Sequence, residues 1–294
     1  MNMSLVIASR NRARMLARAL GSLAEVRVPA GLSWEVVLVD NGSSDSTAEV
    51  MQAASRRLRC TVRVVKEFRH GVAHAWNRGL RSARGEIIAF ADDDVTFERN
   101  WLGALWEAFG DDGVQVVQGQ MDLVFPKPAP AWVDRQWAMT FLGHFGPEES
   151  GDHLVGGNFA ARSEVFEKVG YFDINMPDLW DTEYSRRVIR AGYRIDYVPA
   201  MQVDHHMPRS RFVGWRFIRQ NYWWGRSATR LESTGLSWQR YARWLTKEAL
   251  TELMMASWSL LGGETMKTLE HLCRVSNRVG ILRSVAGERL KVIP

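Results

Sequence analysis

Cysteine is scarce in this chain of 294 residues, which contains two copies, Cys60 and Cys273, far apart in the sequence. Two distant cysteines exclude a disulfide-stapled scaffold and a zinc site built on clustered thiolates, and they fit a reducing compartment. The chain also lacks an apolar run of the about 20 residues that a membrane-spanning helix needs. The most apolar stretch, 249–261, is shorter and contains Glu252. We therefore expect a cytoplasmic protein, and the first residues do not resemble a signal peptide.

Acidic residues are nearly absent from one segment. Between His205 and Leu245, eight arginines stand against one acid, Glu232, and six of the 13 tryptophans lie between Trp215 and Trp258. This imbalance predicts an anionic partner. Two interpretations stay open, a packed helix with a solvated basic face and an interfacial helix on the anionic inner face of a membrane. No nucleic-acid-binding motif accompanies the charge, so we expect no nucleic acid partner.

Hydrophobic patterning over the first 125 residues alternates short apolar runs with helical periodicity. The runs predict strands at Leu5–Ala8, Trp34–Val39, Thr61–Val65 and Glu86–Ala91. The segments between them predict helices, one of them starting in a capping box of Ser46 and Glu49. Buried strands that are apolar throughout and separated by helices are typical of a mostly parallel, doubly wound α/β sheet.

The rest of the chain is less regular. We expect a loop at Phe125–Pro130, a short helix after Gly156–Phe159, a helix at Thr182–Ala191 and a strand at Tyr193–Val198. From Arg211 onward the pattern is helical, with large or small apolar residues at spacings of three and four. These are Trp238, Tyr241, Leu245, Ala249, Leu253, Ala256 and Leu260. The sequence thus predicts an α/β domain over 1–210, in two halves (1–125 and 126–210), and a helical extension over 211–294.

Three polar clusters follow predicted strands, where ligands bind in open α/β sheets. They are Ser9-Arg10, Asp40-Asn41-Gly42 and Asp92-Asp93-Asp94. The consecutive carboxylates would raise each other's pKa unless a cation neutralised them, and oxygen ligands suit Mg²⁺ or Mn²⁺. The alternative for the acidic run is a solvated turn that caps the next helix, and for Asp40 it is an Asx-type turn.

Two further polar groups leave two interpretations each. Asp181 and Glu183 open a predicted helix, so they could complement its dipole or supply a general base. The pair Asp204-His205 follows a predicted strand, and the imidazole could be incidental or a metal ligand.

Taken in order, these segments resemble glycosyltransferase family 2, whose members share the GT-A fold. The resemblance covers about the first 210 residues and is carried by motifs that recur in a fixed order. They are Val6–Arg12, Val37–Asp45, Gly71 with Ala75–Leu80, Gly85–Asp94, Trp101-Leu102, Gly156–Arg162, Gly170–Asp173, Asp181–Glu183, Ala191–Ile195, Tyr197–Pro199 and His205.

The resemblance implies an inverting transfer of a sugar from a nucleotide-diphosphate donor to an acceptor hydroxyl, with Mn²⁺ or Mg²⁺. It assigns three groups of residues. The implied catalytic residues are Asp181 as general base and Glu183 in support, and the implied metal ligands are Asp94, Asp92 and His205. The implied nucleotide-sugar site is Ser9, Arg10, Asp40, Asn41, Gly42, Asp45, Gly71, Asn77, Asp92 and Asp93, with acceptor contacts from Gly157, Asn158 and Trp180.

One position departs from the family pattern. Members usually carry an acid directly before the base, where this chain has Trp180. An aromatic ring there could stack on a sugar face, so we expect altered acceptor binding.

The family implies a donor that is most commonly a UDP-sugar, and a saccharide or lipid-linked saccharide acceptor in polysaccharide or glycoconjugate synthesis. A nucleotidyltransferase is the nearest enzymatic alternative, but the turn at Ser9–Arg12 lacks the glycines that such an enzyme uses to hold a triphosphate. A non-catalytic sugar-nucleotide-binding scaffold is the other alternative. The oligomeric state stays open, a dimer being one option.

Overall fold

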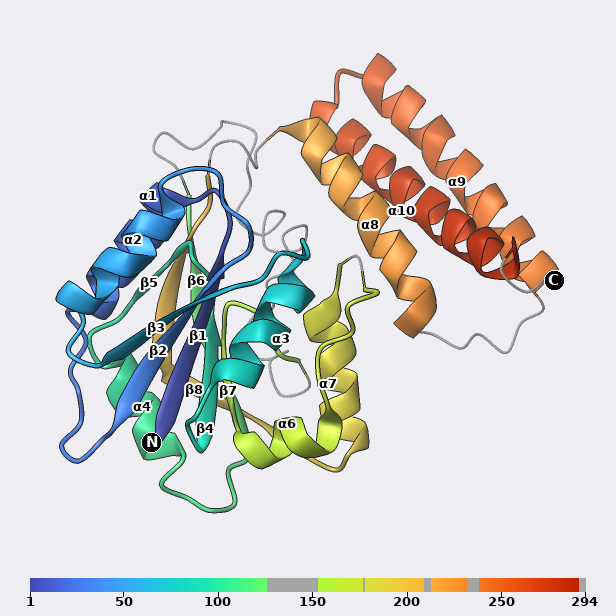
Figure 1. The fold of residues 1–294 in the computed structure, drawn as a ribbon. Helices are drawn as coiled ribbons and strands as arrows, with labels where there is room; N and C mark the ends of the chain where they lie inside the picture. Colours follow the sequence, from blue (N-terminus) through green and yellow to red (C-terminus); the bar gives the residue numbers. More distant parts are fainter. Residues whose placement is uncertain (126–152, 177, 209–212, 232–237, 291–294) are drawn as a thin grey trace. The chain divides into compact units, whose positions relative to one another are not determined.

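In the computed structural model, the described residues are 1–125, 153–176, 178–208, 213–231 and 238–290. They form two compact units (Figure 1). The sheet unit holds 1–125, 153–174 and 181–207, and the helical unit holds the described residues of 175–180 and 208–290. The loop predicted at Phe125–Pro130 lies, beyond Phe125, outside the described residues.

The sheet unit is built on one eight-stranded sheet with the order β3-β2-β1-β4-β7-β6-β8-β5. Its central strands are buried along their length because they are mainly apolar, whereas β3 at the edge is largely exposed. The strands are β1 (Met3–Ser9), β2 (Trp34–Asp40), β3 (Thr61–Lys66), β4 (Ile87–Ala91), β5 (Val95–Phe97), β6 (Val116–Val124), β7 (Asn158–Arg162) and β8 (Ile195–His206).

The sheet is mixed. Parallel pairing joins β1 to β2 and β4, β2 to β3, and β6 to β8, while β7 is antiparallel to both of its neighbours and β5 to β8. The α/β prediction is confirmed: β1–β4 form a continuous parallel half, and β6 and β8 add a further parallel pair. The register places Ser9 beside Asp40 and Ile7 beside Ala91, so β1, β2 and β4 end at one edge.

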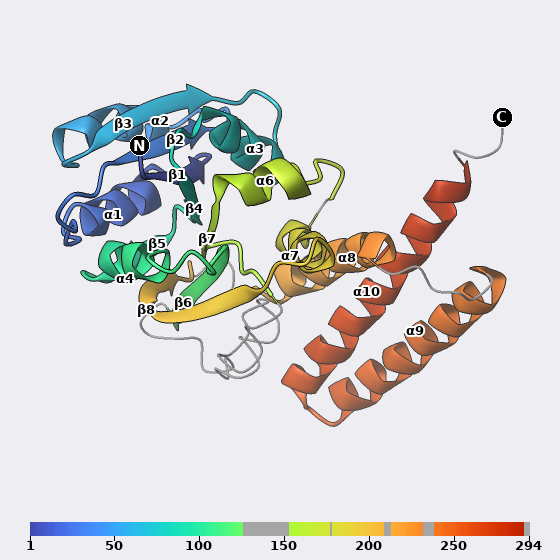
Figure 2. The ribbon, with the colours of Figure 1, turned by 90° about the horizontal axis from the view of Figure 1, so that it is seen from below.

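Helices cover both faces of the sheet (Figure 2). On one face lie α1 (Ala13–Leu23), α2 (Thr47–Ala53) and α4 (Trp101–Ala108), which share one apolar core with the strands. On the other face lie α3 (Val72–Ser82), α6 (Ser163–Val169) and α7 (Trp180–Arg190). That second core is aromatic: the rings of Trp76 and Phe90 stack at 4.6 Å, and those of Phe90 and Phe159 at 5.1 Å. A short 3₁₀ helix, η1 (Ala54–Arg56), follows α2.

Of three local predictions, two differ from the structure. Ser46 makes no side-chain capping hydrogen bond, and the carboxylate of Asp45 accepts from the backbone N–H of Thr47, the first residue of α2 (3.0 Å). The short helix predicted after Gly156–Phe159 is confirmed as α6, and residues 158 and 159 begin strand β7, which precedes it. The strand predicted to end at Val198 continues to His206, since it pairs with β6 up to that residue and also with β5 at 203–205.

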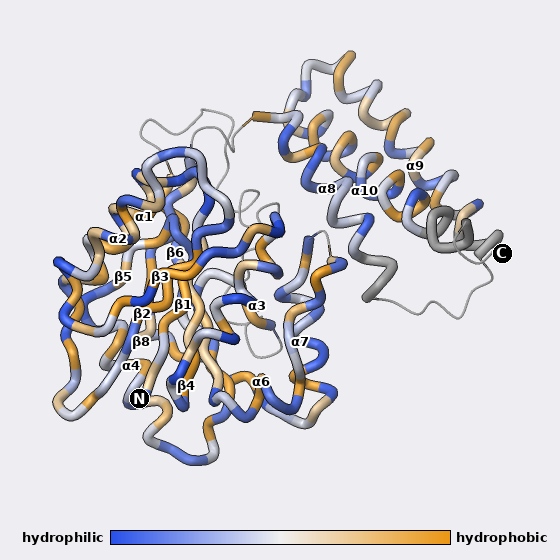
Figure 3. The backbone as a smooth tube through the Cα atoms, in the orientation of Figure 1, coloured by the Kyte–Doolittle hydropathy of each residue, from blue (hydrophilic) through white to orange (hydrophobic). Residues whose placement is uncertain are grey.

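The helical unit contains α8 (Gly214–Leu231), α9 (Trp238–Leu261) and α10 (Thr265–Leu290). The helical periodicity predicted after Arg211 is confirmed in its described part, and α9 carries hydrophobic residues through its length (Figure 3). Within the described residues, no helix combines the length and the apolarity that crossing a bilayer requires.

Candidate active site

A cluster of three carboxylates follows β4 at the edge where β1 and β2 also end. Asp93 and Asp94 are buried, at 4% and 1% exposure. The hydroxyl of Ser9 donates to Asp93 Oδ2 at 2.5 Å, so the predicted convergence of the first and third polar clusters is seen directly. Burial raises the pKa of Asp93, and burial together with the neighbouring Asp94 raises the pKa of Asp92 to about 6. A positive charge beside these carboxylates would therefore stabilise their ionised form.

Three of the predicted metal ligands lie together. Oxygens of Asp92 and Asp94 and a ring nitrogen of His205 all fall within 4.8 Å of one another. The antiparallel pairing of Val95 with His205 produces this approach, because it places His205 next to the end of β4. His205 Nε2 is 3.1 Å from Asp94 Oδ1. Two carboxylates and one imidazole form a donor set that fits Mn²⁺, and the raised pKa of Asp92 is the electrostatic cost that such a cation would relieve.

Arg12 belongs to this cluster, and the sequence analysis did not assign it to the site. Its Nη1 donates to Asp93 Oδ1 at 2.8 Å and to Asp94 Oδ2 at 2.9 Å. Burial opposes the charged form of Arg12, but the attraction of Asp93 and Asp94 outweighs it and raises the pKa of the guanidinium. The only signal in the sequence was a second arginine in the turn after the first strand.

Gly157 lies directly against the acidic cluster. Its carbonyl accepts from the N–H of Asp92 at 3.4 Å. A Cβ atom at this position would stand 2.8 Å from Asp92 Oδ2 and 2.5 Å from the methyl of Met121. Glycine here lets the backbone before β7 approach Asp92 closely, and the predicted acceptor contact of Gly157 stays a prediction.

The second polar cluster holds two loops together. Asp40 Oδ1 accepts from the N–H of Ser43 at 2.9 Å, the Asx-type turn that was one of the two interpretations, and Gly42 has a φ of 74°. Asn41 Oδ1 accepts from the N–H of Gly71 at 3.0 Å. Its amide also donates to the carbonyls of residues 67 and 69, at 3.0 and 2.8 Å. The loop before α3 is thereby fixed beside the end of β2.

The outer rim of this edge carries Arg10 and Asp45, two of the three remaining residues of the predicted nucleotide site. Arg10 is exposed, and its Nη2 is 3.4 Å from Nε2 of His70. The carboxylate of Asp45 accepts from the backbone N–H of Ala13 at 3.3 Å and from Thr47. A nucleotide contact by either residue stays a prediction.

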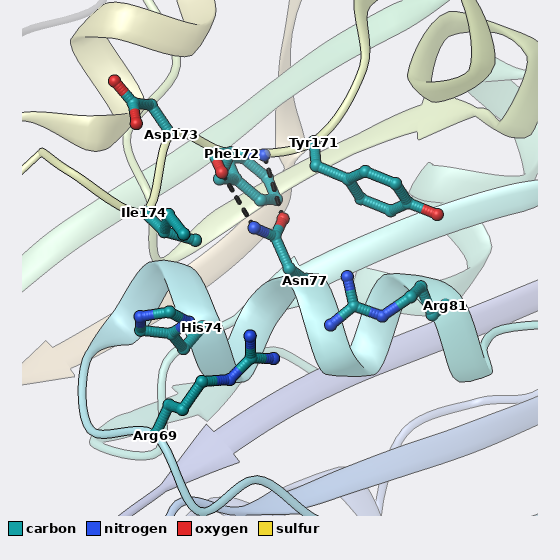
Figure 4. Close-up of a pocket in the computed structure, with 8 residues that line it drawn as sticks. All are labelled: Arg69, His74, Asn77, Arg81, Tyr171, Phe172, Asp173 and Ile174. Carbon is teal, nitrogen blue, oxygen red and sulfur yellow. Dashed lines mark hydrogen bonds between the residues drawn. The ribbon is translucent and has the colours of Figure 1, made fainter.

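Asn77 has a different environment. Its amide donates to the carbonyl of Phe172 at 2.8 Å and accepts from the N–H of Phe172 at 2.9 Å, a reciprocal pair in a buried setting. Figure 4 shows this pair in a pocket of about 310 Å³, with Arg69 and His74 toward one end and Arg81 and Tyr171 toward the other. Asn77 thus lines the pocket while its amide is hydrogen-bonded to the backbone of Phe172. Its predicted contact with the nucleotide-sugar stays a prediction.

The predicted base lies at the start of α7. Asp181 Oδ1 accepts from the N–H of Thr182 at 2.8 Å, and Asp181 Oδ2 accepts from the N–H of Gly156 at 3.2 Å. Burial raises the pKa of Asp181 despite these two donors. The bond to Gly156 links the base to the segment that carries Gly157. Trp180 immediately precedes it as the first residue of the helix.

Glu183 and Asn158 are engaged by neighbouring protein groups. Glu183 forms a two-point ion pair with Arg187, at 2.6 and 2.8 Å, and Arg187 also donates to the carbonyls of Val169 and Tyr171. Asn158 is fully buried; it accepts from the indole N–H of Trp101 at 2.8 Å and donates to two backbone carbonyls. Both arrangements favour a positioning role for these side chains.

Comparison with known proteins identifies a family and several relatives. The model of the family described as "Glycosyl transferase family 2" matches residues 4–170. Glycosyltransferase AglE of Haloferax volcanii is 25% identical over 66% of this chain and 63% of its own length. The pre-mycofactocin glycosyltransferase of Mycobacterium tuberculosis is 29% identical over 78% of this chain and 47% of its own. The chain thus spans less than two thirds of the length of these curated relatives.

Solved structures show the same fold. The mannosyltransferase PcManGT from Pyrobaculum calidifontis, in complex with GDP-Man and Mn²⁺, superposes with a TM-score of 0.67 at 20% identity, covering 96% of this chain and 87% of that one. Residues 1–349 of S. aureus TarS, in complex with UDP-GlcNAc, superpose with a TM-score of 0.58 at 15% identity, covering 99% and 92%. The GT-A type of α/β fold with a helical C-terminal region is therefore confirmed. On the family match over more than half of its length, this chain belongs to glycosyl transferase family 2.

Proposed function

We propose that this chain transfers a sugar from a nucleoside-diphosphate sugar to an acceptor hydroxyl, with inversion at the anomeric carbon. The observation that carries the proposal is the pairing of two carboxylate sites in one unit. One is the Asp92, Asp94 and His205 cluster at the sheet edge, and the other is Asp181 at the start of α7. The first suits the diphosphate of a donor, and the second suits the proton of an acceptor.

The donor side needs positive charge and receives it from two sources. A divalent cation held by Asp92, Asp94 and His205 would supply charge to the leaving diphosphate. Arg12 opposes the rise in the pKa of Asp93 that burial causes, and it holds Asp93 and Asp94 in place by its two short hydrogen bonds. Ser9 fixes the remaining oxygen of Asp93, so the carboxylates are oriented before a donor arrives.

The acceptor side is a carboxylate with an elevated proton affinity. Burial raises the pKa of Asp181, which brings it closer to the pH at which a general base works best. Asp181 would take the proton of the acceptor hydroxyl while the oxygen of that hydroxyl bonds to the anomeric carbon and the diphosphate leaves. The N–H groups of Gly156 and Thr182 hold the carboxylate in one orientation during this transfer.

The substrate class follows from chemistry and from relatives. PcManGT was solved with GDP-Man and TarS with UDP-GlcNAc, so the fold accommodates either nucleotide. We propose a nucleoside-diphosphate hexose as donor, with UDP as the first carrier to test, and a saccharide or lipid-linked saccharide as acceptor. A role in polysaccharide or glycoconjugate synthesis is the setting that this acceptor class suggests.

The experiment is a donor-consumption assay. The purified chain is incubated with Mn²⁺ and sugars on UDP, GDP, TDP or CDP, with and without acceptor saccharides, and release of nucleoside diphosphate is measured. We expect release from one donor, its loss in Asp94→Ala, and its retention in the matched control Asp112→Ala, whose side chain is fully exposed. Equal release by the Asp94→Ala variant would contradict the proposal, and pyrophosphate release from a nucleoside triphosphate would favour a nucleotidyltransferase.

A further inference from the structure

The second half of α9 presents an apolar surface to solvent. Seven large apolar side chains between residues 250 and 261 are between 46% and 88% exposed. They are Leu250, Leu253, Met254, Met255, Trp258, Leu260 and Leu261. Folded proteins rarely leave so many large apolar residues of one element in contact with water, and such patches mark interaction surfaces.

Six exposed residues of α9, four of them from this surface, form one line. Positions three and four apart lie on the same side of a helix, so a stripe runs along α9. We define the α9 stripe as Arg243, Lys247, Leu250, Met254, Trp258 and Leu261, all of them exposed. It starts with two cations and continues with four apolar residues, of which Trp258 is 79% and Leu261 88% exposed.

The opposite side of α9 is used within the helical unit. Leu245 and Ala256 are buried there. Glu252 turns to α10, with His271 Nδ1 at 2.6 Å and Arg274 Nη1 at 3.5 Å. The stripe itself contains no acid. Glu252, the acid in the second half of α9, is already paired with residues of α10.

Hydroxyl groups beside the stripe do not make it polar. Thr246, Thr251 and Ser257 each donate to the carbonyl four residues earlier in α9, at 2.8, 3.0 and 3.0 Å. Their donors are consumed by the helix itself. The surface thus offers hydrophobic contact and two cations, with few groups for directional hydrogen bonds.

We infer that the α9 stripe lies on the surface of a bilayer that contains anionic lipids. Met254, Trp258 and Leu261 would enter the boundary between headgroups and acyl chains, and Arg243 and Lys247 would lie at the lipid phosphates. Charge complementarity selects this occupant, since cations and apolar groups follow one another along one line. A lipid surface also needs none of the hydrogen-bond donors that the stripe lacks.

The arginine-rich helix that the sequence pointed to is a weaker candidate. In α8, Trp215 and Arg216 are exposed, but the neighbouring Phe217 is buried at 3%. The guanidinium of Arg216 lies over the ring of Trp215 at 5.5 Å. Among the described side chains of α8, the exposed cations are not accompanied by a line of exposed apolar residues, so we assign lipid contact to α9.

The test is co-sedimentation of the full chain with phosphatidylcholine vesicles, with and without phosphatidylglycerol. We expect binding to the anionic vesicles and a drop of about 10-fold in Trp258→Glu, whose exposed position should leave the melting temperature unchanged. Trp215→Glu on α8 is the matched control and should bind as wild type. Reversal of Arg243 and Lys247 to Glu should weaken binding by about 5-fold for each cation removed.

Three outcomes would overturn the inference. They are absence of binding to either vesicle, equal binding by Trp258→Glu and wild type, and a dimer that Trp258→Glu converts to monomer while vesicles stay unbound. A second measurement covers the case of a poorly folded variant: an environment-sensitive fluorophore at Leu261→Cys should shift to the blue on anionic vesicles, and one at Lys267→Cys should not. No sugar donor is present, so failure of this test is separate from failure of the proposed transfer.

Discussion

The two units of this chain depart in opposite ways from the usual burial of apolar residues and exposure of charged ones. The sheet unit buries carboxylates, with Asp94 at 1% and Asp93 at 4% exposure, whereas the helical unit exposes large apolar groups, with Trp258 at 79%. Charged residues are rarely buried unless they are paired, and large apolar groups are rarely exposed in clusters. Each departure costs stability, so each indicates that the folded chain meets something that it does not itself contain.

The difference lies in how each unit compensates. In the sheet unit the compensation is internal and partial, through Arg12 and Ser9, and a cation would complete it. In the helical unit the α9 stripe has no internal partner among the described residues that would cover it. Buried carboxylates that are already oriented are suited to binding a small ligand and to catalysis. An exposed apolar surface is suited to contact with a large partner, and such a contact would fix where the protein is located.

The largest effect should come from the base. We expect Asp181→Asn to lower kcat by about 10²- to 10⁴-fold, because the acceptor proton then has no carboxylate to receive it. The KM for donor should change little. Single-turnover transfer under saturating donor measures this, with Glu183→Gln as the control, which should keep most of the rate because Glu183 serves Arg187. Turnover of Asp181→Asn near the wild-type rate would remove Asp181 from the chemistry.

The next effect concerns the approach of backbone to the acidic cluster. In Gly157→Ala the added methyl would collide with Asp92 Oδ2 and Met121. We expect the affinity for Mn²⁺ to fall by about 10- to 100-fold, the range that is typical when the groups that hold a metal ligand in place are mutated. Gly21→Ala is the control, because a Cβ there meets nothing within 4 Å. The measurement is the rate of donor consumption as a function of Mn²⁺ concentration. Identical titration curves for the two variants would contradict the claim that a methyl at position 157 disturbs Asp92.

Removal of Arg12 should produce a smaller loss that depends on metal. Arg12→Met leaves Asp93 and Asp94 without their cation, so we expect a free energy of unfolding about 2 kcal/mol lower, allowing for the partial exposure of Arg12. Urea unfolding should show this loss without metal and a reduced loss with Mn²⁺ and nucleoside diphosphate. Arg14→Met, at an exposed arginine in the first turn of α1, which Arg12 precedes, should show neither. A loss that metal does not reduce would separate Arg12 from the metal site.

The smallest effect is a shift in pH dependence. A carboxylate must be ionised to act as a base, and burial raises the pKa of Asp181. The acid limb of kcat/KM should therefore lie above the ordinary aspartate value of about 3.9, with activity lost as the pH falls through it. The pH profile of transfer measures the limb. A limb at or below the ordinary value would show that Asp181 is not the titrating group.

Local patterning was sufficient for the strands that build the ligand edge. Strands β1, β2 and β4 are mainly apolar, so their ends, and with them Ser9, Asp40 and Asp92, could be placed from sequence. Strand β6 escaped prediction because Gln118, Gly119 and Gln120 interrupt its apolar pattern. The extent of β8 depends on its pairing with β6 and β5, which join residues far apart in the sequence, such as Val124 with His206 and Val95 with His205.

Side-chain roles that depend on distant partners were not predictable. Nothing near Arg12 in the sequence reveals that it meets Asp93 and Asp94 across about 80 positions. Asn77 matched a family motif, but its use by the backbone of Phe172 is visible only in three dimensions. Periodicity in α9 predicted a helix and listed Leu253 and Leu260 in one series with Leu245 and Ala256. Leu245 and Ala256 are buried, whereas Leu253 and Leu260 are exposed, at 46% and 66%. Spacing fixes which residues share a side, and packing decides which side is covered.

The most direct test of the donor site is the melting temperature of the purified chain with UDP, GDP, TDP or CDP, each with Mn²⁺ and again with EDTA. A nucleotide at about 100 times its dissociation constant should stabilise the fold by roughly 2.7 kcal/mol. The account predicts a rise with one diphosphate that disappears in EDTA and in Asp94→Ala. A melting temperature that no nucleotide changes, or a rise that Asp94→Ala retains in full, would contradict a cation-dependent donor site at Asp92, Asp94 and His205.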